Sequence, residues 1–94
     1  MSSPAGEYML LLEQFLSKKM SVEDFQVAYL NHFKKETRRL DESVFELLDS
    51  TFGDVDAFTT DPLLLAESPD FYLDEEGLRK KVRFIVSRLA DLTK

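Results

Sequence analysis

The sequence contains no cysteine and only one histidine, His32, among its 94 residues. The absence of cysteine excludes disulfides, thiolate metal ligands and a cysteine nucleophile, and it fits a reducing compartment such as the cytoplasm. A lone histidine has no histidine or cysteine partner with which to form a metal site, so we interpret His32 as a structural residue. The sequence therefore predicts no catalytic residue, no metal site and no cofactor.

Long hydrophobic runs are also missing. The first apolar run, Tyr8–Leu12, is far too short for a signal peptide or a membrane span, and no basic residue precedes it. We therefore expect a cytoplasmic protein with no membrane segment. Residues 1–6 have the composition of a flexible leader, and residues 7–94 are enough for one domain with a modest core.

Basic residues are absent from the middle of the chain. Between Leu40 and Leu78 there are twelve acidic side chains and not one Lys or Arg, whereas the segments on either side are net basic. The net charge of -6 lies wholly in this block. Such a patch repels nucleic acid and membrane surfaces and speeds encounters with a basic partner. The sequence therefore predicts a basic protein as partner, and no binding of nucleic acid or membrane.

The residues that are present follow a helical pattern. Hydrophobic residues make up 44% of the chain, including eight Phe and three Tyr, and they recur every three or four positions. We predict helices over about 7–18, 22–38, 43–60 and 75–92. Four amphipathic helices with short connections favour an all-α fold, a single-domain antiparallel four-helix bundle. The predicted buried stripes are Tyr8, Leu11, Leu12, Phe15 and Leu16; Val22, Phe25, Tyr29 and Phe33; Phe45, Leu48, Phe52 and Val55; and Leu78, Val82, Ile85, Leu89 and Leu92.

Several residues are typical of helix ends. Ser21 and Ser43 are predicted N-caps, Asp74 is the predicted N-cap of the last helix, and Pro62 is expected to end the third helix. A loop is expected from Asp61 to Leu73. In the last helix, Glu75 with Arg79 and Glu76 with Lys80 have the spacing of stabilising ion pairs.

The third predicted helix carries acids along one side. Positions 42, 46, 49, 53 and 56 are spaced by four, three, four and three residues, and four of them are acidic. Like charges at such spacing cost about 0.2 to 0.5 kcal/mol each. A solubilising face would explain the acids, but selection for a basic partner explains why they are stacked at a self-repelling spacing. We prefer the second interpretation.

Other kinds of site fit the sequence poorly. Asp54 and Asp56 resemble the start of a calcium loop, but Phe58, Thr59 and Leu65 stand where the loop needs ligands and a glycine. The basic runs Lys34–Arg39 and Arg79–Arg83 are interpreted as features of helix ends and ion pairs rather than as a phosphate-binding surface.

Two segments resemble the colicin D immunity protein family. Residues 71–83, FYLDEEGLRKKVR, resemble the start of the last helix in that family, and residues 15–25, FLSKKMSVEDF, resemble its first two helices with their connecting turn. Near the end of the third helix, Asp56, Phe58 and Asp61 match the family.

The resemblance implies an immunity protein that binds the C-terminal nuclease domain of a cognate toxin and blocks it. It implies that the nuclease cuts tRNA and that the acidic face mimics RNA phosphates. By family position we expect Asp56 and Asp61 in the toxin-binding face, and the acidic stripe adds Glu46 and Asp49. Glu67 and Asp70, in the loop, are further candidates. We expect a 1:1 heterodimer with the toxin and a free monomer.

Two alternatives remain open from sequence. The toxin can belong to a contact-dependent inhibition system or have a target other than tRNA. Alternatively, the chain can be a helical adaptor whose acidic face docks a basic protein with no toxin involved.

Overall fold

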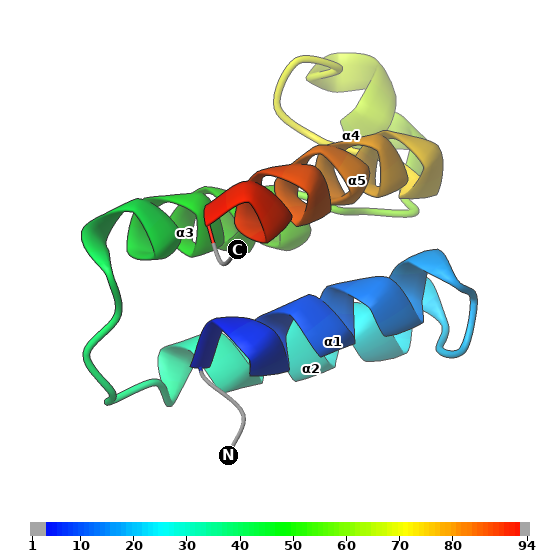
Figure 1. Cartoon of the computed structure of the whole chain (residues 1–94). Helices are drawn as coiled ribbons and strands as arrows, with labels where there is room; N and C mark the ends of the chain where they lie inside the picture. The colour runs from blue at the N-terminus through cyan, green and yellow to red at the C-terminus, as the bar shows by residue number, and fades with distance from the viewer. Residues whose placement is uncertain (1–3, 93–94) are drawn as a thin grey trace.

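The computed structural model describes residues 4–92, which form five α-helices (Figure 1). The helices are α1 (Pro4–Leu16), α2 (Val22–Lys34), α3 (Glu42–Asp56), α4 (Pro62–Glu67) and α5 (Glu75–Leu92). The prediction of an all-α single domain is confirmed. The predicted number of helices was wrong by one, because the expected loop from Asp61 to Leu73 contains α4.

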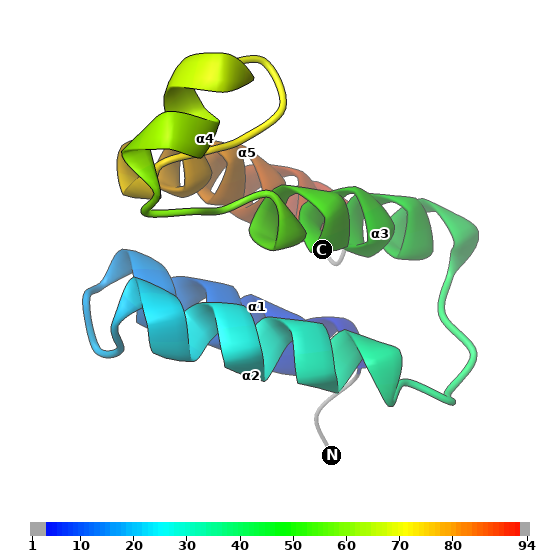
Figure 2. The ribbon, with the colours of Figure 1, turned by 180° about the vertical axis from the view of Figure 1, so that it is seen from behind.

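The four longer helices lie in two layers, with α1 beside α2 and α3 beside α5 (Figures 1 and 2). Contacts join α1 to α2, α2 to α3, α3 to α5 and α5 back to α1, so these helices form a closed ring. The short α4 lies outside this ring, next to the beginning of α5. Among the described residues, no helix is long and apolar enough to cross a membrane.

Aromatic side chains fill the space between the layers. The rings of Phe15 and Phe25 are stacked with centroids 4.2 Å apart, and Tyr29 lies against Phe25. The buried Tyr29 hydroxyl donates a hydrogen bond of 2.8 Å to the carbonyl of Leu48, which satisfies its polar group and links α2 to α3. The fully buried hydrophobic side chains are Tyr8, Leu12, Phe15, Phe25, Tyr29, Leu48, Val55, Leu78, Val82 and Leu89.

The buried face of α3 differs from the prediction. Its buried residues are Val44, Leu48, Thr51 and Val55. Phe45 is exposed and Phe52 is half-buried, and both rings contact Phe33 of α2 at the edge of the core. The prediction followed the three- and four-residue spacing of the apolar side chains, whereas the buried face is the one directed between α2 and α5, and only Leu48 and Val55 belong to both. Leu92, at the end of α5, is also exposed rather than buried.

Helices α1 and α2 differ from their predicted boundaries. Helix α1 begins at Pro4, so the leader expected over residues 1–6 is helical from Pro4 onward, and residues 1–3 lie outside the described part. Proline suits the first turn of a helix because no intrahelical partner awaits its missing N–H. Helix α2 begins after Ser21, whose side chain accepts from the backbone N–H of Asp24 as predicted, but it ends at Lys34 instead of residue 38.

Asp41 rather than Ser43 caps α3, since its carboxylate accepts from the backbone N–H of Ser43 at 3.0 Å. Helix α3 ends at Asp56, earlier than predicted, because the chain then extends to form a bridge between Phe58 and Leu73. Pro62 therefore begins α4 instead of ending a longer α3.

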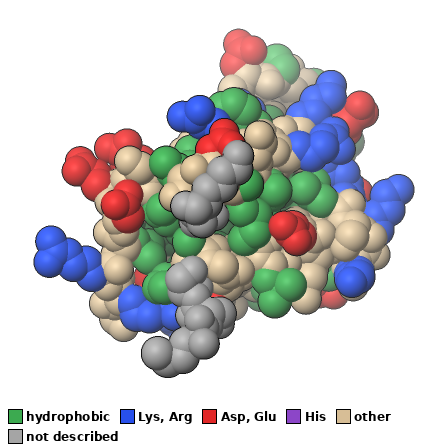
Figure 3. Space-filling view, viewed as in Figure 1, with side chains coloured by type: hydrophobic (Ala, Val, Ile, Leu, Met, Phe, Trp, Pro, Cys, Tyr) green, Lys and Arg blue, Asp and Glu red, His purple; other side chains and the backbone are tan. Residues whose placement is uncertain are grey.

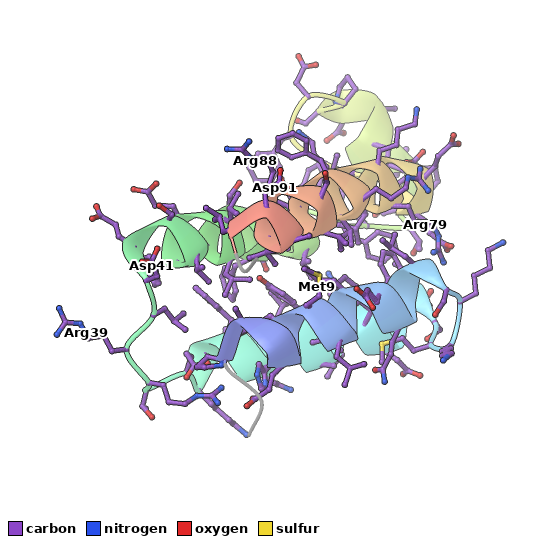
Figure 4. All side chains as sticks on the ribbon, viewed as in Figure 1. Met9, Arg39, Asp41, Arg79, Arg88 and Asp91 are labelled. Carbon is purple, nitrogen blue, oxygen red and sulfur yellow. The ribbon has the colours of Figure 1, made fainter. Side chains whose placement is uncertain are left out.

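The start of α5 agrees with the sequence. The Asp74 carboxylate accepts from the backbone N–H of Gly77 at 2.8 Å, as expected of an N-cap. The ion pair of Glu75 with Arg79 measures 3.0 Å. Arg79 also donates to the carbonyl of Phe15 and lies over the Phe15 ring, so it joins α5 to the end of α1 (Figure 4).

A polar network holds the start of α1 against the segment that follows α2. Arg38 makes two hydrogen bonds to Glu7, of 2.6 and 2.9 Å, and also bonds the carboxylate of Glu36. The Tyr8 hydroxyl donates to Glu36 at 3.0 Å, and His32 lies 3.6 Å from Glu7. Hydrogen bonds from Arg38 lower the pKa of Glu36 to about 2 and also lower the pKa of Glu7. His32 therefore lies in this polar cluster, beside Glu7 and the Tyr8 ring.

The network predicts how stability depends on pH. Because the folded pKa of Glu36 lies below the ordinary value of 4.5, its contribution is present above pH 4.5 and is lost as the pH falls toward 2. We expect Arg38→Met to lower the midpoint of urea denaturation at pH 7 and to flatten the pH dependence of stability between pH 4.5 and 2. Denaturation curves across this range, with the exposed Arg39→Met as the matched control, measure both effects. An Arg38→Met curve parallel to that of the parent would contradict this assignment.

Candidate functional site

Three of the predicted site residues lie together on α3. Glu46, Asp49 and Asp56 are all exposed, on the side of the helix opposite the buried residues Val44, Leu48, Thr51 and Val55. At 1.5 Å per residue, Glu46 and Asp56 are roughly 15 Å apart along the axis. Glu42 and Gly53 complete this surface, which we name the acidic face of α3. It is long enough to contact several groups of a partner.

The end of α3 places negative charge where a helix disfavours it. Asp54 and Asp56 lie in its last turn, which contains no basic residue. The carbonyl groups at a helix C-terminus carry partial negative charge, so an acid there is unfavourable by about 0.3 to 1 kcal/mol. Burial also raises the pKa of Asp54, although the charge of Lys81 on α5 opposes that shift. From sequence, Asp54 was considered only as a calcium ligand, and its interaction with Lys81 follows from the packing of α3 against α5.

Gly53 lies within the acidic face and serves no visible structural purpose in the free protein. A Cβ at this position would meet nothing within 4 Å, and the backbone does not have the positive φ that favours glycine. Glycine inside a helix costs about 1 kcal/mol relative to alanine. Its absence of a side chain leaves the backbone of α3 open to close approach by a partner. Sequence reasoning noted its position in the stripe but missed this possible role.

The other three predicted site residues lie on a different segment. Asp61 is the N-cap of α4 and accepts from the backbone N–H of Leu63 at 2.9 Å, Glu67 is the last residue of α4, and Asp70 follows in the loop. All three are exposed. The predicted residues therefore form two groups, one on α3 and one on or beside α4. Asp61 also has a structural role that the sequence analysis did not assign to it.

Charges of opposite sign occupy different parts of the surface. In the view of Figure 3, acidic side chains gather over the start of α3, and most Lys and Arg side chains lie toward the first half of α5 and the α1–α2 turn. Two arginines of the basic runs, Arg38 and Arg79, are engaged in the ion pairs described above. These ion pairs agree with the interpretation of the two basic runs as features of helix ends and ion pairs.

The hollows of the surface are shallow. The one between the start of α1 and the α2–α3 connection has a volume of about 440 Å³. Its lining is mostly apolar, with Arg39 and Asp41 at one side (Figure 4). Within residues 4–92, no group of three His, Cys, Asp or Glu side chains is arranged to hold a metal ion.

The geometry of Gly53 predicts a more stable variant. We expect Gly53→Ala to raise the free energy of unfolding of the free protein by about 1 kcal/mol, because alanine favours the helix and its methyl group has open space. Equilibrium urea denaturation measures the change. Gly77→Ala is the comparison, since a Cβ at Gly77 would lie only 3.2 Å from the carboxylate of Asp74. Equal or lower stability of Gly53→Ala would show that Gly53 has a role within the fold.

Comparison with known proteins identifies the family. Residues 2–89 match the family described as bacterial self-protective colicin-like immunity. Searches of curated proteins and of solved structures gave no match. Proteins of this family are inhibitors and not enzymes, in agreement with the prediction from sequence. Because the match covers most of the chain, the protein belongs to the bacterial self-protective colicin-like immunity family.

Proposed function

We propose that this immunity protein inhibits the C-terminal nuclease domain of its cognate toxin by placing the acidic face of α3 in a basic active-site cleft. Family membership supports the general role, which is binding and inhibition of a toxin. The nuclease target, with tRNA as its substrate, follows from the resemblance to the colicin D immunity proteins. We further propose a 1:1 complex formed in the cytoplasm and a monomer when free.

This proposal rests on one observation: several residues that destabilise the free helix α3 lie together on one exposed surface. Between Glu46 and Asp56, α3 combines stacked acids, a glycine with no steric need, and an acid in the last turn. Each weakens the free helix by a fraction of a kcal/mol to about 1 kcal/mol. Residues that conflict with local stability are expected where function requires them. A basic partner would reverse the electrostatic part of this cost.

The chemistry of the surface suits the proposed mimicry. A carboxylate accepts charge-assisted hydrogen bonds from Lys and Arg, as a phosphate oxygen does. The acidic side chains at 46, 49 and 56 would occupy positions along the cleft that RNA phosphates otherwise fill. Gly53, between them, would let the cleft wall approach the helix backbone. The antiparallel bundle that we propose for α1, α2, α3 and α5 would serve as a rigid support for this face.

The direct test is an inhibition assay. The C-terminal domain of the toxin encoded immediately upstream of this chain's gene is incubated with total tRNA, with and without an equimolar amount of the chain. We expect cleavage to stop when the chain is present. Binding without inhibition would contradict the occupation of the active site, and an absence of binding would contradict the toxin assignment and favour the adaptor.

Charge reversal tests the acidic face itself. We expect Asp49→Lys/Asp56→Lys to weaken binding to the toxin domain at least about 100-fold, mainly by slowing association. The association rate should also depend less on salt concentration. The helix content should not fall, since both side chains are exposed and a lysine at residue 56 suits the end of α3. Surface plasmon resonance at several salt concentrations, with circular dichroism, measures these properties.

The matched control is Glu13→Lys/Glu23→Lys, which makes the same change in net charge at exposed sites on α1 and α2. Asp61 should be tested as Asp61→Asn, because asparagine can still cap α4. Equal loss of binding in the control and in the α3 variant would mean that net charge, and not the acidic face, determines affinity.

A further inference from the structure

The segment that contains α4 projects from the helical ring and is fastened at its base. Residues 59–72, which we name the α4 segment, leave the ring after Phe58 and return at Leu73 (Figures 1 and 2). The backbone N–H of Thr59 donates to the carbonyl of Leu73, and that of Leu73 donates to Ala57, each at 3.0 Å. Gln26 of α2 donates to the carbonyls of Val55 and Phe58 below this junction. The base is therefore held in place, and the segment is presented in a defined position.

The α4 segment exposes large apolar side chains. Leu63 is 71% exposed and Phe71 is 66% exposed, the highest values among the large hydrophobic residues that are exposed in the described chain. Helix α4 has no buried residue. The Phe71 ring meets the Tyr72 ring edge-on at 4.8 Å, which restricts its orientation while leaving it accessible. An aromatic side chain that is already restrained loses less entropy on binding.

The α4 segment also borders an apolar hollow, lined in part by its residues Leu65, Pro69 and Tyr72. It lies between the α4 segment and the start of α5 and has a volume of about 360 Å³. Its lining residues are Leu65, Pro69, Tyr72, Leu73, Asp74 and Gly77. The segment thus has both exposed apolar side chains and an apolar hollow. At the centre of protein interfaces, apolar side chains of one partner fill apolar pockets of the other.

The surrounding charge indicates what binds there. Asp61, Glu67 and Asp70 are exposed on the α4 segment, and residues 59–72 include no Lys or Arg. Two copies of this chain that paired through the segment would bring these carboxylates together, which is unfavourable. A partner with basic residues around an apolar pocket is complementary to it.

We propose that the α4 segment is a second toxin-binding surface, in which Leu63 and Phe71 enter an apolar pocket beside the toxin's basic cleft. This inference rests on the proposed function, since it takes the toxin domain as the partner. The acidic face of α3 and the α4 segment then have different tasks. Charged groups chiefly accelerate association, whereas buried apolar anchors chiefly slow dissociation.

The experiment measures association and dissociation rates of the upstream-encoded toxin domain with Leu63→Ala and Phe71→Ala. We expect each variant to dissociate about 10-fold faster or more, with an unchanged association rate and an unchanged salt dependence. Leu10→Ala and Val27→Ala are matched controls, because these residues are similarly exposed but lie on α1 and α2. They should dissociate at the parental rate. Thermal unfolding should be unchanged for all four variants, since none of these side chains is buried.

The outcomes separate this inference from the proposed function. Parental dissociation rates for both Leu63→Ala and Phe71→Ala, in a complex that still needs Asp49 and Asp56, would overturn the second surface alone. No binding of the toxin domain by the parental chain would overturn both proposals. The other candidate to cover the α4 segment is a second copy of this chain, and sedimentation equilibrium of the free chain tests it. A dimer that the Phe71→Ala substitution dissociates would show that a second copy covers the segment. That result would also overturn the inference.

Discussion

The hydrogen bond from Tyr29 to the carbonyl of Leu48 links the two helical layers, and it favours the orientation of α3 that brings Leu48 to Tyr29. Tyr29 is fully buried, and a buried hydroxyl without a partner would cost about 1 to 3 kcal/mol. The layers therefore pack in the register that brings this oxygen to α3. In that register Val44, Leu48, Thr51 and Val55 enter the core and the acidic residues point to solvent. The candidate site is thus a consequence of how the core is packed.

The acidic face and the α4 segment differ in how the fold supports them. The acidic face belongs to a long helix with one side buried, so charged side chains can be changed there without loss of the fold. The α4 segment contributes no fully buried residue outside its base and is held by backbone hydrogen bonds around Phe58 and Leu73. One surface is a rigid array of charge, and the other is an apolar projection with a fixed attachment. In combination they suit a partner that carries both a basic cleft and an apolar pocket.

Predictions from short sequence patterns were confirmed where the interactions involve only residues close together in the chain. The Asp74 cap and the Glu75–Arg79 pair depend on residues within four positions and agree with the structure. Pro62 was misinterpreted because a proline is compatible both with the end of one helix and with the first turn of the next. Ser43 was misassigned because Asp41, two residues earlier, is an equally good cap. Phe45 and Phe52 were placed in the core because they share a three- and four-residue spacing with Leu48 and Val55, but both rings contact Phe33 of α2 at the edge of the core.

The sequence by itself determined the helical class, the separation of charge along the chain and the acidic stripe at 42, 46, 49 and 56. These properties depend on residue type and on spacing within one helix, which are fully present in the sequence. Only the tertiary structure decided that Val44 and Thr51, and not Phe45 and Phe52, complete the buried side of α3. It also decided that Asp54 lies half-buried near Lys81, and that residues 59–72 project from the ring with Leu63 and Phe71 exposed. The physical reason is that burial depends on how pairs of elements pack. Lys81, Tyr29 and Leu73 interact with residues 14 to 27 positions away, and no local pattern in the sequence predicts those contacts.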